Sequence, residues 1–505
     1  MHSLENQPVL ILGLGHSGLA MARWCARAGA QVTVADTRDT PPQLDALRRE
    51  LPAAHFVSGP FVAALVEGSP VRAVFKSPGL TPDTVALVLT AARAQGLWVG
   101  GELDLFSQAL AGLRQSQDYT PKVLAITGTN GKTTVTSLTG QLVERSGKSA
   151  VVAGNIGPTL LDTLTEKLDS DSLPQVWVLE LSSFQLDGVS GFEPSAATVL
   201  NLTQDHLDWH GTMQAYAQAK ARVFGQHALM LLNRDDPQVV AMLPAPVKIK
   251  GGKTTQRDYL TFGGNMPQRP GDFGIETVND MAWLVRALES DQTIKKRHGE
   301  EPEIHIQRLI PADALRIRGR HNAVNALAAL ALASAAGCAL GPLLYGLRDY
   351  RGEPHRVEPI GVVHGVEYFD DSKGTNVGAT VAALDGLGVE RKVVVILGGD
   401  GKGQDFAPLA APVTRHARAA VLIGRDRAKI RTVLEGTGVP MIEAESMQEA
   451  VLQASRQAHS GDAVLMSPAC ASFDMFDNYG HRAQAFRAAV AVLSAQAGVS
   501  LEGVA

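Results

Sequence analysis

The chain has 505 residues, which is too many for one hydrophobic core, so its length predicts about three domains. Its composition, 45% hydrophobic and 19% charged, is that of a globular protein, and its 50 glycines favour α/β domains with many tight turns. A formal net charge of −5 gives no electrostatic reason to expect nucleic acid or an anionic membrane as a partner.

The cysteines and the amino-terminal segment suggest a cytoplasmic protein. Cys25, Cys338 and Cys470 lie far apart and match no zinc or redox spacing, so we expect buried free thiols in a reducing compartment. The opening segment MHSLENQPVLILG lacks the basic region of a signal peptide. No run of about 18 uncharged apolar residues occurs, so we expect no membrane insertion.

One pattern occurs three times along the chain: an apolar, β-branched run, a glycine-rich turn and then a helical pattern. The runs are Val9–Leu12, Val123–Thr127 and Val393–Leu397. Strands that are buried on both faces have such continuous apolar runs. The predicted fold class is therefore α/β, with parallel sheets covered by helices.

Two breaks divide the chain into three predicted domains. Polar residues Ala111–Pro121 resemble a linker, and Gly352 and Pro354 interrupt a helical stretch near Tyr350–Pro354. We predict a Rossmann-like domain at 1–112, a P-loop-type ATPase domain at 113–352 and a second Rossmann-like domain at 353–505. The charge-rich segment Ser290–Gln307 has no clear period and is predicted to be an exposed insertion without chemistry.

The first domain carries a dinucleotide-type turn. Gly13, Gly15 and Gly18 follow the first strand with the required spacing, and Asp36 closes the next strand. Alone, this pattern indicates NAD. However, the same turn can hold any diphosphate, and Asp36 can bind any ribose or uridine hydroxyl, so hydride transfer is only one option.

The second turn predicts an ATP site. Its residues are Gly128, Thr129, Asn130, Gly131, Lys132, Thr133 and Thr134. Backbone N–H groups at the start of a helix bind phosphate, Lys132 can reach the β- and γ-phosphates, and the Thr133 hydroxyl can bind Mg²⁺. The loop departs from the general P-loop pattern, because Ile126 stands where the first glycine would be.

Two neighbouring strands of the central domain end in polar residues. Glu180 lies at the end of the run Val176–Leu181, and His206 belongs to the polar cluster after Ala197–Leu202. Active sites gather at the carboxyl ends of parallel strands, so Glu180 and His206 are candidates for a Mg²⁺ and catalytic site. Taken alone, Glu180 would be a solvated carboxylate at a strand end.

Other polar residues of this domain are less distinctive. From the residues alone, Lys220 on the helical segment Met213–Phe224 is predicted to be a surface lysine. Asn322 and Asn325 are three residues apart and share a helix face. Asparagine is a poor helix former, so either a helix cap or a ligand contact explains them.

The third domain offers three polar loops after strands. Asp370–Asn376 follows Val366–Phe369 and is predicted to be either a solvated turn or part of a site. The loop around Lys402 presents backbone amides and an ammonium group, which suit a carboxylate. Ser472 adds a hydroxyl in the loop after the strand Ala463–Met466.

Together these segments resemble the Mur ligase family, the ATP-dependent amino-acid-adding enzymes of peptidoglycan synthesis. The resemblance covers nearly the whole chain and rests on motifs in a fixed order: ITGTNGKTT (126–134), GNIG (154–157), LELSSFQL (179–186), NLTQDHLD (201–208), GRHNAVNALAA (319–329), PHR (354–356), DDSKGTN (370–376), LGGDGKG (397–403) and SPACASFD (467–474). GLGHSG, LELSSFQL and SPACASFD are most similar to members that add D-glutamate to UDP-N-acetylmuramoyl-L-alanine.

The resemblance implies a role for each matching residue. The catalytic and metal shell would be Lys132, Thr133, Glu180, His206 and Lys220, with Lys220 carried as a carbamate that binds Mg²⁺. Outside the loop at 128–134, ATP would contact Asn322, Asn325, Arg356 and Asp371. The UDP-substrate would contact Gly15, His16, Ser17, Asp36, Thr37, Arg38, Gly79 and Asn155. D-Glutamate would contact Thr375, Lys402, Ser472, Phe473 and Tyr479.

The implied reaction is amide formation through an acyl phosphate, by a protein that we expect to be monomeric. The chain departs from the family at Tyr479, where Phe is usual, at His16 and Ser17, and at Trp209-His210-Gly211, where an Arg-Tyr-Pro-like run is common. Alternatives are another ligase of the family, such as a folylpolyglutamate synthase relative, an NAD-linked oxidoreductase, or a nucleotide-binding regulator without turnover.

Overall fold

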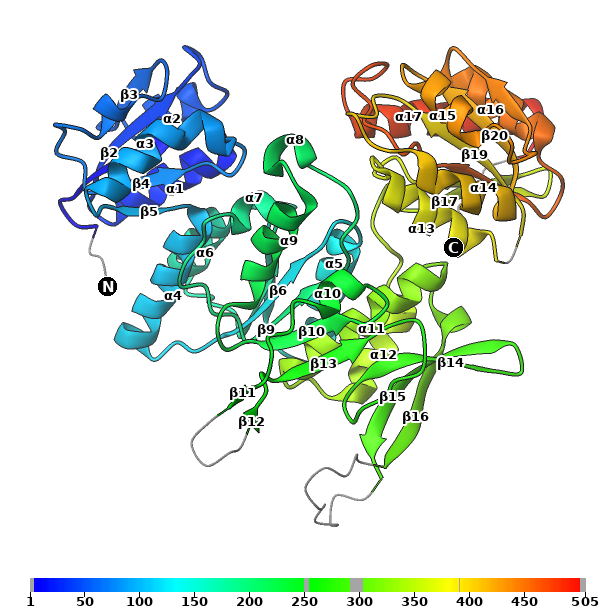
Figure 1. Cartoon of the computed structure of the whole chain (residues 1–505), viewed down its shortest axis with the longest axis horizontal. Helices are drawn as coiled ribbons and strands as arrows, with labels where there is room; N and C mark the ends of the chain where they lie inside the picture. The colour runs from blue at the N-terminus through cyan, green and yellow to red at the C-terminus, as the bar shows by residue number, and fades with distance from the viewer. Residues whose placement is uncertain (1–3, 249–253, 291–302, 390, 500–505) are drawn as a thin grey trace.

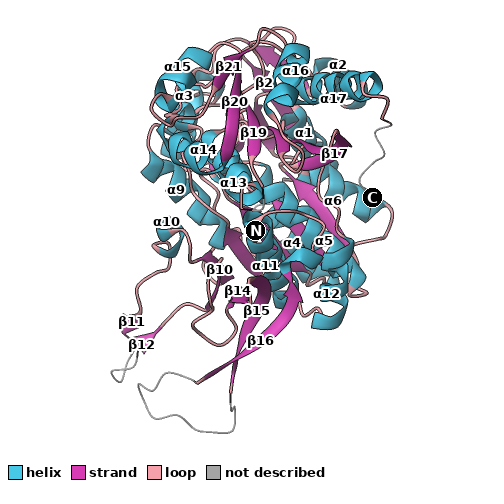
Figure 2. Cartoon of the chain, turned by 90° about the vertical axis from the view of Figure 1, so that its right-hand side faces the viewer, coloured by secondary structure: helices cyan, strands magenta, loops and turns pink. Residues whose placement is uncertain are grey.

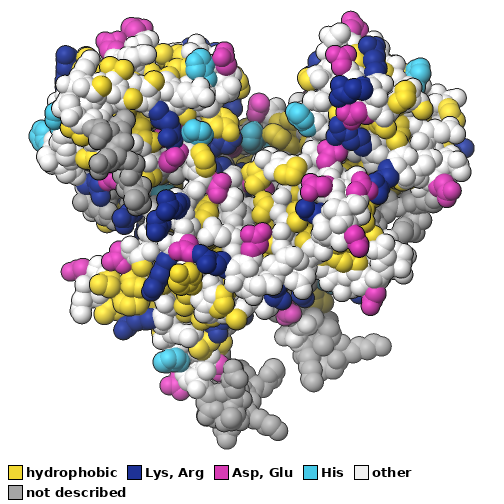
Figure 3. Space-filling view, turned by 180° about the vertical axis from the view of Figure 1, so that it is seen from behind, with side chains coloured by type: hydrophobic (Ala, Val, Ile, Leu, Met, Phe, Trp, Pro, Cys, Tyr) yellow, Lys and Arg dark blue, Asp and Glu magenta, His cyan; other side chains and the backbone are white. Residues whose placement is uncertain are grey.

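The computed structural model describes residues 4–248, 254–290, 303–389 and 391–499. Three α/β units are arranged in a V: the first and third lie side by side above the central one (Figure 1). Figure 3 shows, from behind, the hollow between the two upper units. The predicted fold class is confirmed, since parallel sheets with helices dominate each unit.

The first unit is a five-stranded parallel sheet with the order β3-β2-β1-β4-β5. Its apolar runs occupy the central strands, which are buried on both faces. Its strands are β1 Pro8–Leu12, β2 Gln31–Asp36, β3 His55–Ser58, β4 Ala73–Lys76 and β5 Trp98–Gly100. Its helices are α1 His16–Arg27, α2 Leu44–Glu50 and α3 Pro82–Ala94, with a 3-10 turn at Ala63–Leu65.

The central unit contains a six-stranded parallel sheet with the order β13-β10-β9-β6-β8-β7. Its strands are β6 Lys122–Thr127, β7 Ala150–Gly154, β8 Val176–Glu180, β9 Ala196–Val199, β10 Leu229–Asn233 and β13 Tyr259–Phe262. Its helices are α4 Glu102–Gln117, α5 Lys132–Arg145, α6 Leu160–Asp169, α7 Ser183–Leu186, α8 Leu207–His210, α9 Met213–Ala221, α10 Pro237–Val240, α11 Arg320–Ala335 and α12 Leu340–Asp349, with 3-10 turns at Arg222–Phe224 and Ala312–Ala314.

An antiparallel sheet projects from the central unit, away from the other two (Figure 2). Its strands are β14 Phe273–Val278, β15 Met281–Glu289 and β16 Ile304–Pro311, and a two-stranded ribbon nearby comprises β11 Val247–Lys248 and β12 Thr254–Thr255. The predicted insertion Ser290–Gln307 falls mostly outside the described residues. Its last residues belong to β16 and are exposed or partly exposed.

The third unit is a six-stranded sheet with the order β17-β18-β22-β19-β20-β21, in which only β17 runs antiparallel to its neighbour. Its strands are β17 Glu358–Val363, β18 Val366–Asp370, β19 Val393–Gly398, β20 Ala417–Ile423, β21 Met441–Glu443 and β22 Ala463–Met466. Its helices are α13 Val377–Leu387, α14 Ala410–His416, α15 Arg427–Leu434, α16 Met447–Gln457 and α17 Tyr479–Gln496, with a 3-10 turn at Ala407–Leu409.

The first and central units share one hydrophobic core. A single buried cluster extends from β1 to β10, and within it the rings of Phe106 on α4 and Trp177 on β8 lie 5.2 Å apart. This packing overturns the predicted linker at Ala111–Pro121, because α4 continues to Gln117 and Leu113 packs against the cluster. The third unit has its own core clusters, on the two faces of its sheet.

Candidate active site

The phosphate-type loop joins β6 to α5, as predicted. Gly128 has a φ of +152°, and a side chain there would bring a Cβ to 3.0 Å from the Cβ of Leu200, so the turn requires glycine. Lys132 Nζ donates to the carbonyl oxygens of Gly128 and Thr129 at 2.9 and 2.8 Å. Burial lowers the pKa of Lys132, although the carboxylate of Glu180 opposes this effect.

Glu180 is buried at the end of β8, with 1% of its surface exposed. Its Oε1 accepts a hydrogen bond from Asn155 Nδ2 at 2.7 Å, whereas its Oε2 has no partner among the residues that the structure describes. A buried carboxylate oxygen without a partner is costly unless a ligand or ion satisfies it. Glu180 is therefore a functional candidate rather than a solvated strand end.

Lys220 is buried, with 2% of its surface exposed, so the surface position predicted from the residues alone was wrong. Its Nζ donates to Gly128 O at 2.8 Å and to Thr127 Oγ1 at 3.3 Å. Burial lowers the pKa of Lys220 well below its usual range, and the charge of Lys132 lowers it further. The signal available in the sequence was Tyr216, which is four residues earlier on the same buried face of α9.

His206 lies in the loop before α8, with a φ of +53°. Its Nε2 is 3.6 Å from Asp205 Oδ2, and its ring lies 4.7 Å from the ring of Phe184. Burial lowers the pKa of His206. The carboxylate of Asp205 opposes this effect, whereas the positive charge of Lys132 adds to it. His206 is thus near the phosphate loop and favours its neutral form.

The third unit reaches the phosphate loop directly. Arg356 Nη2 donates to Thr133 Oγ1 at 2.5 Å, and Asn376 Nδ2 donates to Asn130 Oδ1 at 3.1 Å. Asp371 is buried and accepts from Ser467 Oγ at 2.6 Å, and burial raises its pKa to about 7. The solvated turn considered for this segment is therefore wrong.

Asn322 and Asn325 lie inside the first turns of α11, which begins after Gly319. The helix-cap explanation is thus wrong for both. Asn322 Nδ2 donates to Arg318 O at 2.8 Å, and Asn325 Nδ2 donates to Asn322 Oδ1 at 3.1 Å. A pocket brings these asparagines together with other predicted ATP residues: Asn130, Gly131, Thr134, Arg356 and Asp371.

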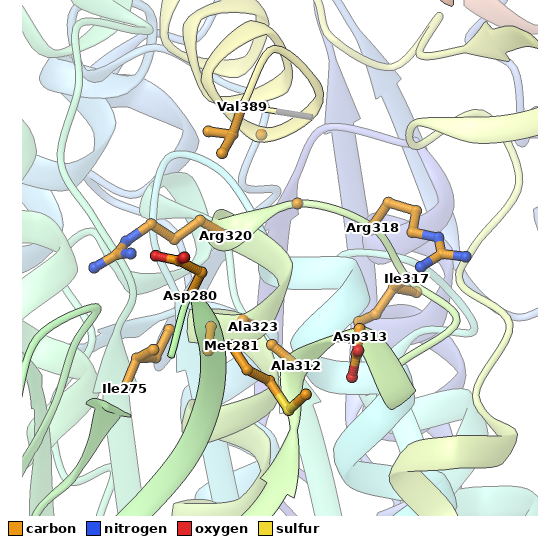
Figure 4. A pocket seen from close by; sticks show the side chains of 13 residues that line it. Ile275, Asp280, Met281, Ala312, Asp313, Ile317, Arg318, Arg320, Ala323 and Val389 are labelled. Atoms are coloured by element: carbon orange, nitrogen blue, oxygen red, sulfur yellow. The ribbon is translucent and has the colours of Figure 1, made fainter. Parts of the chain in front are cut away.

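Sequence reasoning missed several residues of this groove. Lys373 and His321 line the same pocket, and an adjoining pocket shares His321 and Asn325 with it and adds Asn233 and Asp235. A third pocket continues past Arg320 toward the antiparallel sheet, and Figure 4 shows Val389 facing Asp280 and Arg320 across it. The motifs GRHN and DDSKGTN contain His321 and Lys373, so part of the signal was present.

The predicted acceptor residues gather around two paired loops of the third unit. Asp400 and Ala471 form an isolated β-bridge, which brings the loop of Lys402 beside the loop of Ser472. Ser472 is buried, whereas Phe473 is 71% exposed. Thr375 lies in the neighbouring loop, which also contains Lys373. The Nζ atom of Lys373 is 3.8 Å from the centroid of the Tyr479 ring.

Arg482 was not predicted, yet it supports these loops. It is 1% exposed, and it donates to Ser372 O at 2.9 Å and to Cys470 O at 3.1 Å. A single guanidinium thus fixes the loops after β18 and β22 to each other. No local signal marks it, because its burial depends on how α17 packs beneath the sheet edge.

The predicted UDP-substrate residues form the carboxyl edge of the first sheet. Asp36 is buried, accepting from Leu14 N at 2.7 Å and from the guanidinium of Arg38 at 2.8 Å. Exposed or partly exposed residues at the same edge are Gly15, His16, Ser17, Thr37 and Gly79. Asn155 instead contacts Glu180, on the central unit.

The expected thiol state is confirmed, since all three cysteines are buried and free. No helix in the described parts of the chain is long and apolar enough to cross a membrane.

Three α/β units, of which the central one carries a phosphate loop that contacts the third, define a nucleotide-binding protein of several domains. Family models match the chain in order: a Mur ligase MurD-like N-terminal domain at residues 7–101, a Mur ligase middle domain at 126–333 and a Mur ligase glutamate ligase domain at 355–470. The chain belongs to the Mur ligase family.

The chain is also similar to individual members of this family over its full length. The chain is 71% identical to the UDP-N-acetylmuramoylalanine–D-glutamate ligase of Albidiferax ferrireducens over all of both chains. It is 59% identical to the ligase of the same name from Polaromonas sp., covering 99% of this chain and 100% of that one. The fold is similar to that of the MurF ligase of Thermotoga maritima in complex with ADP, with a TM-score of 0.55 at 14% identity over 98% of this chain and 100% of the other.

Proposed function

We propose that this chain is the ATP-dependent ligase that joins D-glutamate to UDP-N-acetylmuramoyl-L-alanine during peptidoglycan synthesis. The supporting observation is the convergence of two units on one loop: Thr133 and Asn130 of the phosphate loop contact Arg356 and Asn376 of the third unit. A loop that binds phosphate and also contacts the acceptor-binding unit suits a reaction that activates one substrate and transfers it to another. The identity to D-glutamate ligases supports the choice of substrates.

The mechanism has two steps. The L-alanine carboxylate of the UDP-substrate attacks the γ-phosphorus of ATP, which gives an acyl phosphate and releases ADP. The amine of D-glutamate then attacks the acyl carbon, and phosphate leaves when the tetrahedral intermediate collapses. Such chemistry depends mainly on positioning and on stabilising charge. Lys132 begins α5 and the guanidinium of Arg356 contacts Thr133 in its first turn, so both residues would bind the phosphates.

ATP would occupy the groove between the central and third units. Its phosphates would lie on residues 128–134, and its nucleoside would continue past Asn325 into the pocket lined by Asn233 and His321. D-Glutamate would lie across the loops of Lys402 and Ser472, where an ammonium group and backbone amides suit its carboxylates.

The residues around Glu180 fit Mg²⁺, because its unpaired Oε2 is a hard oxygen donor and Thr133 Oγ1 and His206 lie around the same loop. Bound Mg²⁺ would supply positive charge to the phosphates. Lys220 would add a further oxygen ligand as a carbamate. Burial depresses its pKa, which favours the neutral amine that reacts with CO₂. A carbamate carbon signal under ¹³C-bicarbonate that disappears in Lys220→Ala would support this modification, and its persistence would refute it.

The decisive experiment measures phosphate release with ATP, Mg²⁺ and UDP-N-acetylmuramoyl-L-alanine. Release should depend on D-glutamate and should be far lower with L-glutamate, L-alanine or a diamino acid. Lys132→Ala should lose most turnover, about 100-fold or more, while still binding UDP. Release that is independent of D-glutamate would refute the proposed substrate, and a wild-type rate in Lys132→Ala would refute the role of the loop.

A further inference from the structure

Lys373 presents an ammonium group that no carboxylate of the described residues neutralises. Its Nζ lies 3.8 Å from the centroid of the Tyr479 ring, and the described parts of the chain give this nitrogen no hydrogen bond or ion pair. The face of a ring attracts a cation but leaves its N–H groups free, whereas a carboxylate would occupy them. Lys373 is also an exposed residue, so its charge is available to a ligand.

The backbone around Lys373 is held in place. Its N–H donates to His355 O at 3.2 Å, and the carbonyl oxygen of Ser372, one residue earlier, accepts from buried Arg482 at 2.9 Å. The backbone N–H of Ser372 also donates to Asp370 Oδ1 at 3.0 Å. A lysine on such a loop presents its charge at a defined place, as a group that acts in catalysis must.

Lys373 lies where the two halves of the proposed reaction would meet. It lines the pocket that also contains Gly131 and Arg356, where the ATP phosphates would bind. Burial lowers the pKa of Lys132, and the positive charge of Lys373 adds to this effect, so the two ammonium groups interact through space. Lys373 also contacts the ring of Tyr479, which is predicted to contact D-glutamate. The same ammonium group is therefore close to both predicted sites.

We propose that Lys373 is a catalytic residue of the second step, whose ammonium stabilises the departing phosphate, and that the Tyr479 ring positions it. This inference rests on the proposed function. In that step the lone pair of the D-glutamate amine forms a bond to the acyl carbon, and the bond from this carbon to the phosphate oxygen breaks. The electron pair of the broken bond goes to that oxygen, and the phosphate takes the proton of the amine and leaves as hydrogen phosphate. A preorganised cation beside the departing oxygen lowers the barrier.

The first step has other cations at its disposal. Lys132 and Arg356 both donate hydrogen bonds to the phosphate loop, where charge develops when ATP is attacked. Within the described ranges, Lys373 makes no hydrogen bond to this loop, and it belongs to the loop after β18, which Arg482 joins to an acceptor loop. We therefore expect Lys373 to matter more for acyl transfer than for activation of the carboxylate.

The ring of Tyr479, rather than its hydroxyl, provides the contact with Lys373. Phe, the residue that is usual at this position in the family, presents the same kind of ring. A cation over an exposed ring is stabilised modestly, so the loss of the ring should weaken the placement of Lys373 without removing its charge.

Hydroxylamine separates the two steps experimentally. It converts an acyl phosphate into a hydroxamate without using the acceptor loops, so hydroxamate formation without D-glutamate reports the first step. In a single turnover at saturating D-glutamate, Lys373→Met should form the amide about 100-fold more slowly than wild type, whereas hydroxamate formation should fall less than about fivefold. Tyr479→Leu should slow amide formation about 3- to 10-fold, and Tyr479→Phe, which keeps the ring, should slow it less. The control is Lys392→Met, an exposed lysine of the same unit whose Nζ donates to Arg415 O, with both rates unchanged.

Each other outcome overturns the inference. Equal loss of both rates would assign Lys373 to ATP, and two unchanged rates would make it a surface cation. A higher KM for D-glutamate with an unchanged rate at saturation would make it a contact for the carboxylates of the substrate. If Lys373→Met does not fold, the comparison of Tyr479→Leu with Tyr479→Phe decides, because equal rates of amide formation would exclude positioning by the ring. If wild type forms no hydroxamate from ATP and UDP-N-acetylmuramoyl-L-alanine, the proposed function fails first and the role of Lys373 fails with it.

Discussion

Glu102 should make the stability of the protein depend on pH, through the core that the first and central units share. It begins α4, is 3% exposed, and its Oε1 accepts from Leu161 N at 3.1 Å. Burial raises the pKa of Glu102 from 4.5 to about 7, although the hydrogen bond from Leu161 opposes this effect. The folded protein therefore keeps a proton that the unfolded chain loses as the pH rises through this window.

The sign and the size of the pH effect on stability follow from this difference in pKa. Because the folded state binds the proton more tightly, stability falls as the pH rises from about 4.5 to about 7 and then stays constant. The difference between a pKa of 4.5 and one of about 7 corresponds to about 3 kcal/mol of stability. Glu102→Gln retains an acceptor for Leu161 N but never carries the charge. It should be more stable than wild type by up to this amount at about pH 8, and nearly equal to it at about pH 4.5.

Thermal unfolding at both pH values measures the effect. For a chain of this length that unfolds as one unit, about 3 kcal/mol raises Tm by about 3 °C. The control is Glu144→Gln, on the exposed face of α5, which should change Tm little at either pH. A Tm difference for Glu102→Gln that is the same at both pH values, or a variant less stable at high pH, would refute the reasoning.

Three further changes test other parts of the structure. Arg482→Met should raise KM for D-glutamate more than tenfold and leave UDP affinity unchanged, because it frees the two acceptor loops; steady-state kinetics and calorimetry would check this. Gly18→Ala should lower Tm by about 1 to 3 °C, because its Cβ would overlap a carbonyl oxygen of the same turn, whereas Gly15→Ala has open space and should keep the wild-type Tm. Arg23→Ala removes two partly exposed ion pairs, with Glu50 of α2 and Asp162 of α6, and should cost about 1 kcal/mol or less in denaturant titration.

The sequence was sufficient wherever local pattern decides structure. The strand predicted at Ala463–Met466 has those bounds, and the loop before α5 lies where its glycines and its lysine predicted. These features depend on apolar runs buried on both faces and on backbone turns, which neighbouring residues specify. The family motifs added residues such as Arg356, whose contact with Thr133 no local pattern contains.

Predictions failed where packing between distant segments decides the outcome. Lys220 resembles any helical surface lysine until α9 packs beneath β6 and buries it. The polar segment after Ala111 resembles a linker, yet α4 continues because the central unit covers one of its faces. Arg482 lies on a helix with no distinguishing spacing, and its role depends on two loops more than a hundred and about ten residues away. No local pattern in a single sequence specifies such contacts between distant segments.

The way the units are joined also determines which of them can move at low cost. The first and central units share an apolar core, and separating them would expose buried surface at about 25 cal/mol per Å². The third unit has its own core, and at the phosphate loop it is held by hydrogen bonds such as those of Arg356 and Asn376. A hydrogen bond exchanged for another changes the free energy by only about 1 kcal/mol. Arg356 and the phosphate-loop residues Asn130 and Thr133, which make these contacts, are also expected to bind ATP. We therefore expect nucleotide binding to replace these contacts and to reposition the third unit, while the first two units move as one body.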